Sequence, residues 1–233
     1  MTKNTRGTRI SIVAALGASM FALAAAQASI TLTGDDRFMS ASATLFLPNG
    51  SGSFSGPFTR TPDFGVDQFG SVAAGAYRDG CEIYVQNFQD SMVRSDFVKA
   101  EGRFKAGAIG RPGYTGVAKI VNRVEYKFTL NAGDFWQAKG TTSGNAYFEL
   151  YDPNGTLLLA NSGIVGGAAI TSGTYRLVAG DNANGMGEAK TPGGPELFEG
   201  SFDVRFEIIP TPSTVALGGM VGMMTLGTRR RRN

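Results

Sequence analysis

The most restrictive feature of this sequence is the alternation of apolar and polar residues in short segments separated by glycine-rich turns. In residues 124–130 valine, tyrosine, phenylalanine and leucine alternate with charged or hydroxyl-bearing residues, and residues 202–208 repeat this pattern. Successive side chains of a β-strand point to opposite faces, so a period of two predicts half-buried strands. Residues 29–209 show no sustained helical periodicity. The sequence therefore predicts an all-β domain.

Turn signals divide this domain further. Asp152-Pro153-Asn154-Gly155 has proline and glycine at favoured turn positions, so a hairpin is expected between 146–151 and 156–160. Residues 48–67 are expected to form a long loop that folds back on a sheet face through its phenylalanines, and residues 181–195 a glycine-rich loop. Two antiparallel sheets in a jelly-roll-like β-sandwich are the most economical arrangement. The other expected strands are 30–32, 41–47, 73–77, 82–88, 98–104, 173–180 and 200–209.

Charge excludes one class of partner. Seven of the 22 lysines and arginines lie in residues 1–28 and 210–233, whereas all 19 acids lie between these segments. Residues 29–209 therefore carry 15 basic and 19 acidic side chains, a net charge of −4. A chain of about 180 residues with this balance suits one domain with a sizeable core. It is not a basic nucleic-acid-binding protein, so no nucleic-acid partner is expected.

Residue types exclude several chemistries. Histidine is absent, which removes the usual general base, histidine-dependent triads and the common zinc sites. Cys81 is the only cysteine, so no intrachain disulfide forms, and we expect it to be a small apolar residue on a strand. We expect neither an enzymatic activity nor a cofactor.

A proline pair, an apolar segment and a basic cluster follow one another at the C-terminal end. Residues 215–228 would form a helix of about 21 Å, against a hydrocarbon core of roughly 30 Å. If the helix extends back to Pro212 and its arginines reach the lipid headgroups, the segment can bridge a bilayer. The arginine run favours the cytoplasmic side. We therefore expect a C-terminal hydrophobic helix that anchors the chain in a membrane.

This order of features resembles the PEP-CTERM sorting signal, which an exosortase-type membrane protease recognises. Pro210, Thr211 and Pro212 stand in for the Pro-Glu-Pro of the family, with threonine at the middle position, and Ser213 follows as the family pattern requires. The resemblance covers about 24 residues of the chain. It implies cleavage near Pro212 by an exosortase-type protease. The arginines that complete the resemblance are Arg229, Arg230, Arg231 and Arg232.

The N-terminal end predicts export as well. A positive leader precedes an apolar, alanine-rich segment at residues 10–26, and Ala26-Gln27-Ala28 fits the small-x-small cleavage pattern. This is typical of a signal helix that passes the secretion translocon and is cut by signal peptidase between Ala28 and Ser29, with Ala26 at the other small position. We expect an exported protein of the cell envelope, cell surface or extracellular space. The expected parts are 1–28 (signal peptide), 29–209 (β-sandwich) and 210–233 (sorting and anchor segment).

Residues 29–209 also resemble the exported β-sandwich proteins that often precede this tail. The resemblance spans about 170 residues and lies in the spacing of short motifs. It implies an architecture and no functional residues, because proteins of this type have no generally assigned activity. The motifs are residues 35–37, 89–91, 126–130, 146–151, 155–158, 173–177 and 201–204.

A lectin-like carbohydrate-binding module is the first alternative function. Trp136, Tyr147 and Tyr151 would stack an extracellular polysaccharide if they were exposed on one face. A single tryptophan in a sandwich more often caps the core. The outcome depends on the exposure of Trp136.

A polysaccharide-active hydrolase is the second alternative, because carboxylate pairs function without histidine. It needs two carboxyl groups about 5 Å or roughly 6.5–9.5 Å apart. Glu149, which lies between two tyrosines, is expected to be a solvated strand residue. The candidate pairs are Asp35 with Asp36, Glu149 with Asp152, and Glu196 with Glu199.

Asp181 opens the best calcium candidate, Asp181-Asn182-Ala183-Asn184-Gly185, since oxygen ligands on a flexible loop suit Ca²⁺. The segment does not match an EF-hand, because Gly180 stands at the first position and Thr191 at the twelfth. A glycine-rich turn is the favoured interpretation, so no metal site is expected.

Overall fold

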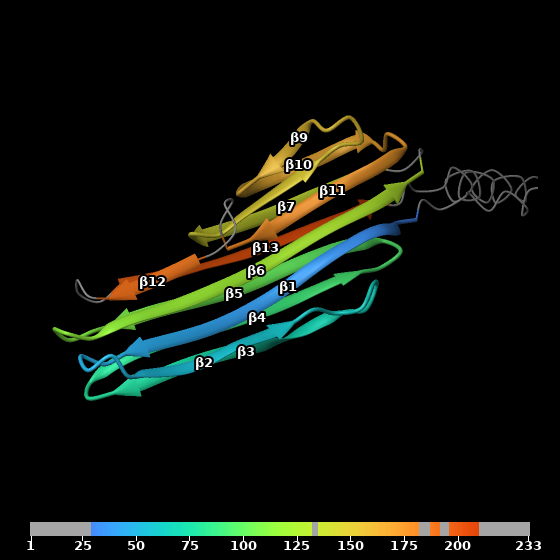
Figure 1. Ribbon diagram of the computed structural model, residues 1–233. Helices are drawn as coiled ribbons and strands as arrows, with labels where there is room; N and C mark the ends of the chain where they lie inside the picture. Colours follow the sequence, from blue (N-terminus) through green and yellow to red (C-terminus); the bar gives the residue numbers. More distant parts are fainter. Residues whose placement is uncertain (1–28, 132–134, 182–186, 192–195, 210–233) are drawn as a thin grey trace, which may run out of the picture. The chain divides into compact units, whose positions relative to one another are not determined.

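The computed structural model describes residues 29–131, 135–181, 187–191 and 196–209. In these residues the chain forms thirteen β-strands and no helix (Figure 1). The strands are β1 (Thr31–Phe46), β2 (Gly52–Arg60), β3 (Gln68–Arg78), β4 (Cys81–Val93), β5 (Phe97–Ile109), β6 (Thr115–Leu130), β7 (Phe135–Gly144), β8 (Tyr147–Tyr151), β9 (Leu157–Ala160), β10 (Ser162–Ala169), β11 (Gly173–Gly180), β12 (Gly187–Thr191) and β13 (Glu196–Ile209).

The strands form two sheets that pack face to face. Sheet A has the order β2-β1-β6-β11-β8-β9, and β12 pairs with the remaining part of β6. Sheet B has the order β10-β7-β13-β5-β4-β3. Neighbouring strands in both sheets run antiparallel. The expected all-β sandwich of two antiparallel sheets is confirmed.

The core lies between the sheets and follows from the alternation in the sequence. Every second residue of β6 is buried from Gly116 to Leu130, and the same holds in β13 from Phe202 to Ile208. Burying a large apolar side chain contributes about 1.5–3 kcal/mol. The long, regular strands therefore supply most of the apolar surface that holds the sheets together.

Four aromatic rings fill one part of this core. The Phe206 ring lies 5.0 Å from Phe128 and 5.5 Å from Trp136, between ring centroids, and is stacked on the tryptophan at 16°. Tyr175 lies 5.8 Å from Phe206. Aromatic pairs of this kind add about 0.5–1.5 kcal/mol beyond the area they bury. The cluster joins β6 and β11 of sheet A to β7 and β13 of sheet B.

A layer of buried amide side chains also crosses between the sheets. Asn122 Nδ2 on β6 donates to Asn87 Oδ1 at 2.7 Å and to the carbonyl of Phe88 at 2.8 Å, both on β4. Gln89 Nε2 donates to Asn122 Oδ1 at 3.0 Å. Asn87 Nδ2 donates to the carbonyl of Val121 at 2.6 Å. Directional bonds in a low-dielectric interior fix the register of β4 against β6.

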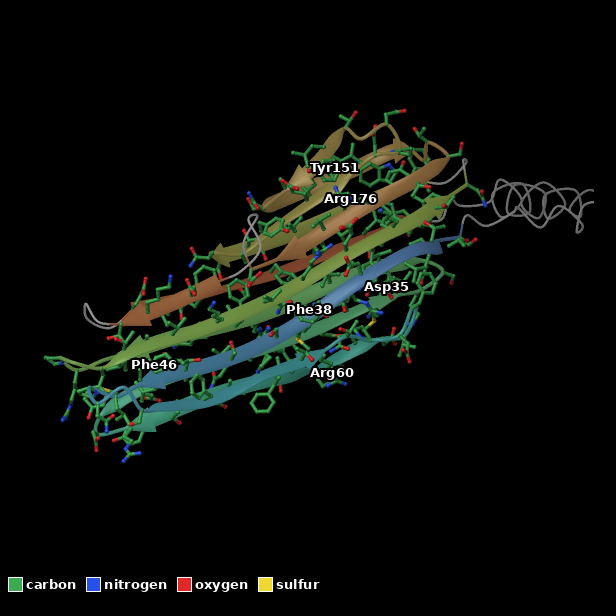
Figure 2. The ribbon with its side chains drawn as sticks, viewed as in Figure 1. Asp35, Phe38, Phe46, Arg60, Tyr151 and Arg176 are labelled. Atoms are coloured by element: carbon green, nitrogen blue, oxygen red, sulfur yellow. The ribbon has the colours of Figure 1, made fainter. Side chains whose placement is uncertain are left out.

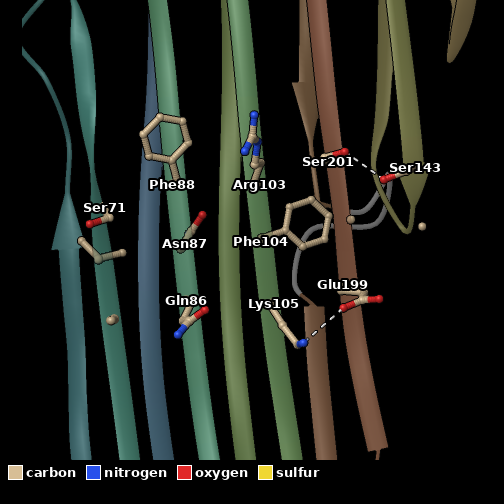
Figure 3. Close-up of a pocket in the computed structure, with 14 residues that line it drawn as sticks. Ser71, Gln86, Asn87, Phe88, Arg103, Phe104, Lys105, Ser143, Glu199 and Ser201 are labelled. Carbon is tan, nitrogen blue, oxygen red and sulfur yellow. Dashed lines mark hydrogen bonds and ion pairs between the residues drawn. The ribbon is translucent and has the colours of Figure 1, made fainter.

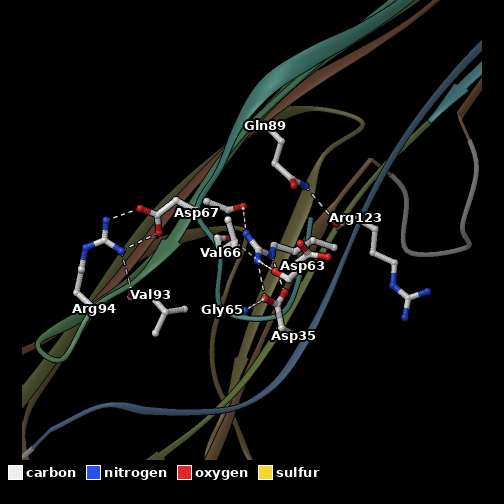
Figure 4. Close-up of polar contacts among 11 residues, drawn as sticks. Asp35, Asp63, Gly65, Val66, Asp67, Gln89, Val93, Arg94 and Arg123 are labelled. Atoms are coloured by element: carbon white, nitrogen blue, oxygen red, sulfur yellow. Dashed lines mark hydrogen bonds and ion pairs between the residues drawn. The ribbon is translucent and has the colours of Figure 1, made fainter. Parts of the chain in front are cut away.

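A buried ion pair holds the segment between β2 and β3 against β1 (Figure 4). Arg37 Nη2 lies 2.5 Å from Asp35 Oδ2, and the two side chains are 1% and 2% exposed. The same guanidinium donates to the carbonyl of Val66 at 2.6 Å, and the Gly65 N–H donates to Asp35 at 2.9 Å. The arginine also covers the Tyr126 ring, with Cζ 5.2 Å from the centroid. We call Arg37, Asp35, Gly65 and Val66 the clasp.

The expected hairpin is confirmed. The strands β8 and β9 pair antiparallel on either side of residues 152–156. Asp152 Oδ1 accepts the N–H groups of Asn154 at 2.8 Å and Thr156 at 2.7 Å, and Gly155 has a φ of +81°. Glycine adopts this left-handed conformation without a steric cost.

Two expected loops contain strands. Residues 52–60 form β2, and the phenylalanines that were expected to cover a sheet face, Phe54, Phe58 and Phe64, are exposed. The strand β12 lies inside the expected loop 181–195. The two short strands expected near the beginning are one strand, β1, and neither β7 nor β10 was expected.

Candidate functional site

The outer face of β8 carries the two tyrosines expected from the sequence. Tyr147, Glu149 and Tyr151 alternate with buried residues. The Tyr151 hydroxyl donates to Glu149 Oε2 at 2.7 Å, and this bond raises the pKa of Tyr151. The Arg176 guanidinium lies over the same ring, with Cζ 5.6 Å from the centroid (Figure 2). One face of Tyr151 is thus covered by a protein cation rather than open to a sugar.

Trp136 does not join these tyrosines. It lies on β7 of sheet B, whereas β8 belongs to sheet A, and it is only 5% exposed. Its ring stacks on Phe206 in the core. The three-ring platform with Trp136 is therefore not formed, and the tryptophan is a core residue because its large apolar surface fills the space between the sheets.

A charge network surrounds Glu125 on the outer face of sheet A. Arg176 Nε donates to Glu125 Oε1 at 2.9 Å, and the nitrogens of Arg123 and Lys127 lie 3.7 Å from its carboxylate. The hydrogen bond from Arg176 and the surrounding cations hold the pKa of Glu125 below its usual value. A shallow cavity of about 270 Å³ adjoins the network. Its lining is Gly34, Asp35, Asp36, Arg123, Glu125 and Lys127.

The first two carboxylate pairs have separate partners. Asp35 belongs to the clasp inside the molecule, whereas Asp36, the next residue of the strand, pairs with Arg123 at 2.5 Å on the outer face. Glu149 accepts from Tyr151, while Asp152 accepts N–H groups of its turn. In both pairs each carboxylate is therefore bound to its own partner.

The two carboxylates of the third pair, Glu196 and Glu199, also have separate partners. Glu196 accepts the backbone N–H of Lys190, and Glu199 Oε2 lies 3.7 Å from Lys105 Nζ. Among the described residues, no group of three or more aspartate, glutamate or cysteine side chains is placed to hold a metal ion.

Asp181, the first residue of the calcium candidate, is buried. Burial raises the pKa of its carboxyl group to about 7, although the Gly187 N–H donates to it at 3.4 Å. Residues 182–186 lie outside the described residues, so the calcium loop stays a prediction.

A further hollow lies on the outer face of sheet B (Figure 3). It has a volume of about 730 Å³ and extends over β3, β4, β5, β13 and β7. We call it the sheet B groove. Its lining is Ser71, Val72, Ala73, Gln86, Asn87, Phe88, Arg103, Phe104, Lys105, Ser143, Gly144, Glu199, Gly200 and Ser201.

The exposed side chains of the groove form two rows across the strands. In the first row the strand register places Ser71 opposite Phe88, Phe88 opposite Arg103, Arg103 opposite Ser201, and Ser201 opposite Ser143. The second row, one side-chain repeat further along the strands, contains Ala73, Gln86, Lys105 and Glu199.

The sequence does not predict this groove, and among the residues that line it only Glu199 was a candidate site residue. The alternation in β5 predicts that Arg103 and Lys105 share a face, but the other members come from four more strands. Their proximity depends on strand order and register, which short-range patterns do not contain. The alternation along β5 is the local signal from which part of the groove could have been predicted.

The sorting and cleavage residues lie mostly outside the described residues. This applies to Ala26, Ala28, Pro210–Ser213 and Arg229–Arg232, and their roles stay predictions. Ser29 is described and half-buried, just before β1. Within the described ranges there is no helix with the length and apolar character needed to span a membrane.

Comparison of the chain with protein-family models, with curated proteins and with solved structures gave no match. The candidate functional surfaces are therefore defined by their geometry alone: the tyrosine face of β8 and the sheet B groove.

Proposed function

We propose that this chain is a non-enzymatic, exported protein of the cell surface or extracellular matrix. A jelly-roll-like body is delivered by an N-terminal signal helix through the secretion translocon and released by signal peptidase. The C-terminal hydrophobic helix holds it in the membrane until an exosortase-type protease cleaves near Pro212. No nucleic acid takes part.

The order of residues at the C-terminal end carries this proposal: a proline pair, serine and threonine, an apolar segment and four final arginines. The limits of the described body are compatible with processing at both ends. The last strand, β13, ends at Ile209, and β1 begins at Thr31, two residues after the expected cleavage point. Both cuts would leave every strand pair intact, so the processed body keeps its core.

Fractionation of the native host tests the proposal. The wild-type chain is compared with a variant in which Arg229, Arg230, Arg231 and Arg232 are all alanine. A matched control replaces Arg60, Arg78, Arg94 and Arg111 of the body by alanine, which removes the same charge and leaves the sheet B groove unchanged. We expect the tail variant to stay in the membrane fraction with its tail, while the wild type and the control leave the membrane. Equal release of all three chains would refute the sorting role.

A further inference from the structure

We propose that the sheet B groove binds a linear, carboxylate-bearing polysaccharide that lies across the strands. The inference deepens the proposed function and rests on it only in that such a polymer would be met outside the cell. It is carried by the combination of a partly exposed aromatic ring, hydroxyl and amide groups, and two cations in one hollow.

The spacing of the groups across the strands suits a glycan chain. Adjacent strands lie about 4.8 Å apart, so the row from Ser71 to Ser143 presents one side chain at each step of that length. This step is close to the length of one pyranose unit in an extended glycan chain. A polysaccharide that crosses the strands would therefore meet a new side chain with each sugar. The row ends in two hydroxyl groups, Ser201 and Ser143, whose oxygens lie 2.8 Å apart.

The groove also offers an aromatic surface. Phe88 is half-buried within the groove, and its ring meets Phe69 edge to face at 5.5 Å. Phe69 is itself exposed on the outer face of β3. Ligand sites in proteins combine such apolar surface with a few polar groups that orient the ligand. Here Gln86 and Ser71 lie on the neighbouring positions and provide those groups.

Two cations of the groove are available to a carboxylate. Arg103 and Lys105 share one face of β5 about 7 Å apart, because two residues of a strand span that distance. Their side chains are 72% and 44% exposed. Arg103 contacts Glu101 at 3.1 Å, and Lys105 contacts Glu199 only at 3.7 Å. A guanidinium has five N–H donors, so Arg103 retains donors for a carboxylate.

The surrounding charges limit the class of anion. The next row along the strands places Asp90 opposite Glu101 and Glu101 opposite Asp203. Lys99 pairs with Asp90 at 2.7 Å and with Glu101 at 3.0 Å, so this side of the groove keeps an excess of acids over cations. Within the groove the cations exceed the acid Glu199 by one. Double-stranded DNA carries one charge per about 1.7 Å and would be repelled by this acidic row, whereas a polysaccharide with at most one carboxylate per sugar places far fewer charges against it.

Binding of the purified full chain, in a detergent without sugar headgroups, tests the inference by calorimetric titration. The probes are alginate oligosaccharides, neutral dextran and polyglutamate, a linear polyanion without sugar rings. Three variants are compared: R103Q/K105Q, F88L, and the control K119Q/K190Q on the outer face of sheet A. Fluorescence of the buried Trp136 verifies that each variant is folded.

We expect the chain to prefer alginate to both other probes. R103Q/K105Q should weaken alginate binding at least tenfold, F88L should weaken it without changing polyglutamate binding, and the control should stay within twofold of the wild type. Equal binding of alginate and polyglutamate, no alginate binding by the wild type, or an equal loss in the control would overturn the inference. The assay uses purified protein, so its result does not depend on sorting. If the chain binds alginate but is not exported by its host, the inference stands and only the proposed function is wrong.

Discussion

The clasp provides the sharpest test of how the sequence stabilises this fold. Replacement of Arg37 by methionine retains much of the side-chain volume but leaves Asp35 as a buried carboxylate without its cation. Breaking a buried ion pair in this way costs about 3–5 kcal/mol, because the remaining charge stays out of water. The carbonyl of Val66 loses its 2.6 Å donor as well.

Urea unfolding of the full chain, followed by the fluorescence of its single tryptophan, measures this cost. With a urea dependence of about 2 kcal/mol per molar for a domain of this size, the midpoint should fall by about 1.5–2.5 M. Arg123→Met is the matched control, since Arg123 and Asp36 form an exposed pair with side chains 50% and 57% accessible. Exposed pairs contribute about 0–1 kcal/mol.

A double variant separates the ion pair from its surroundings. Replacing Asp35 by leucine together with Arg37→Met removes both charges, so part of the lost stability should return. The donors to Val66 and the acceptor for Gly65 remain absent, so we expect a residual loss of about 1–3 kcal/mol. If Arg37→Met and Arg123→Met lower the midpoint equally, the reasoning about the buried pair is wrong.

Three further predictions concern the core. Trp136 should emit at short wavelength and resist quenching by acrylamide, and ready quenching would contradict its burial. Asn122→Ala should lower the free energy of unfolding, measured by urea denaturation, by about 3 kcal/mol, because its partners Asn87 and Gln89 lose buried hydrogen bonds. A loss below about 1 kcal/mol would refute the amide layer. Asp181 has a pKa of about 7 in the folded protein against 3.8 for the free side chain, so the folded state holds a proton that the unfolded state releases. Stability should therefore fall as pH rises from about 4 to about 7. Asp181→Asn should remove this fall, and an unchanged pH dependence of the urea midpoint would contradict the raised pKa.

The sequence predicts the strands whose two faces differ in polarity. Residues 124–130 and 202–208 alternate strictly because one side chain faces the core and the next faces water. Their assignment requires no knowledge of the neighbours. The turn at Asp152 is predicted for a similar reason, since its side-chain hydrogen bonds are local.

The missed strands lack this local signal. The edge strand β2 contains Pro57 and exposed phenylalanines, because the free side of an edge strand needs no N–H donor and its side chains are less constrained. The strand β10 consists largely of small residues and glycines. Only tertiary pairing, with β1 in one case and β7 in the other, stabilises these segments as strands.

The candidate sites likewise separate into features that a local pattern predicts and features that depend on tertiary pairing. The sequence places Tyr147 and Tyr151 on one face of a strand, since only the period of two is needed. It does not settle whether Trp136 faces the core or water, because both sheets contain apolar inner faces. The sheet B groove depends on five strands that are distant in the sequence, and no local pattern contains their register.

The most direct test of the proposed export is the intact mass of the mature protein isolated from its own host. The account predicts a chain that begins at Ser29 and ends near Pro212, so that both the leader and the arginine run are absent. A mass that retains residues 210–233 after full maturation would contradict it.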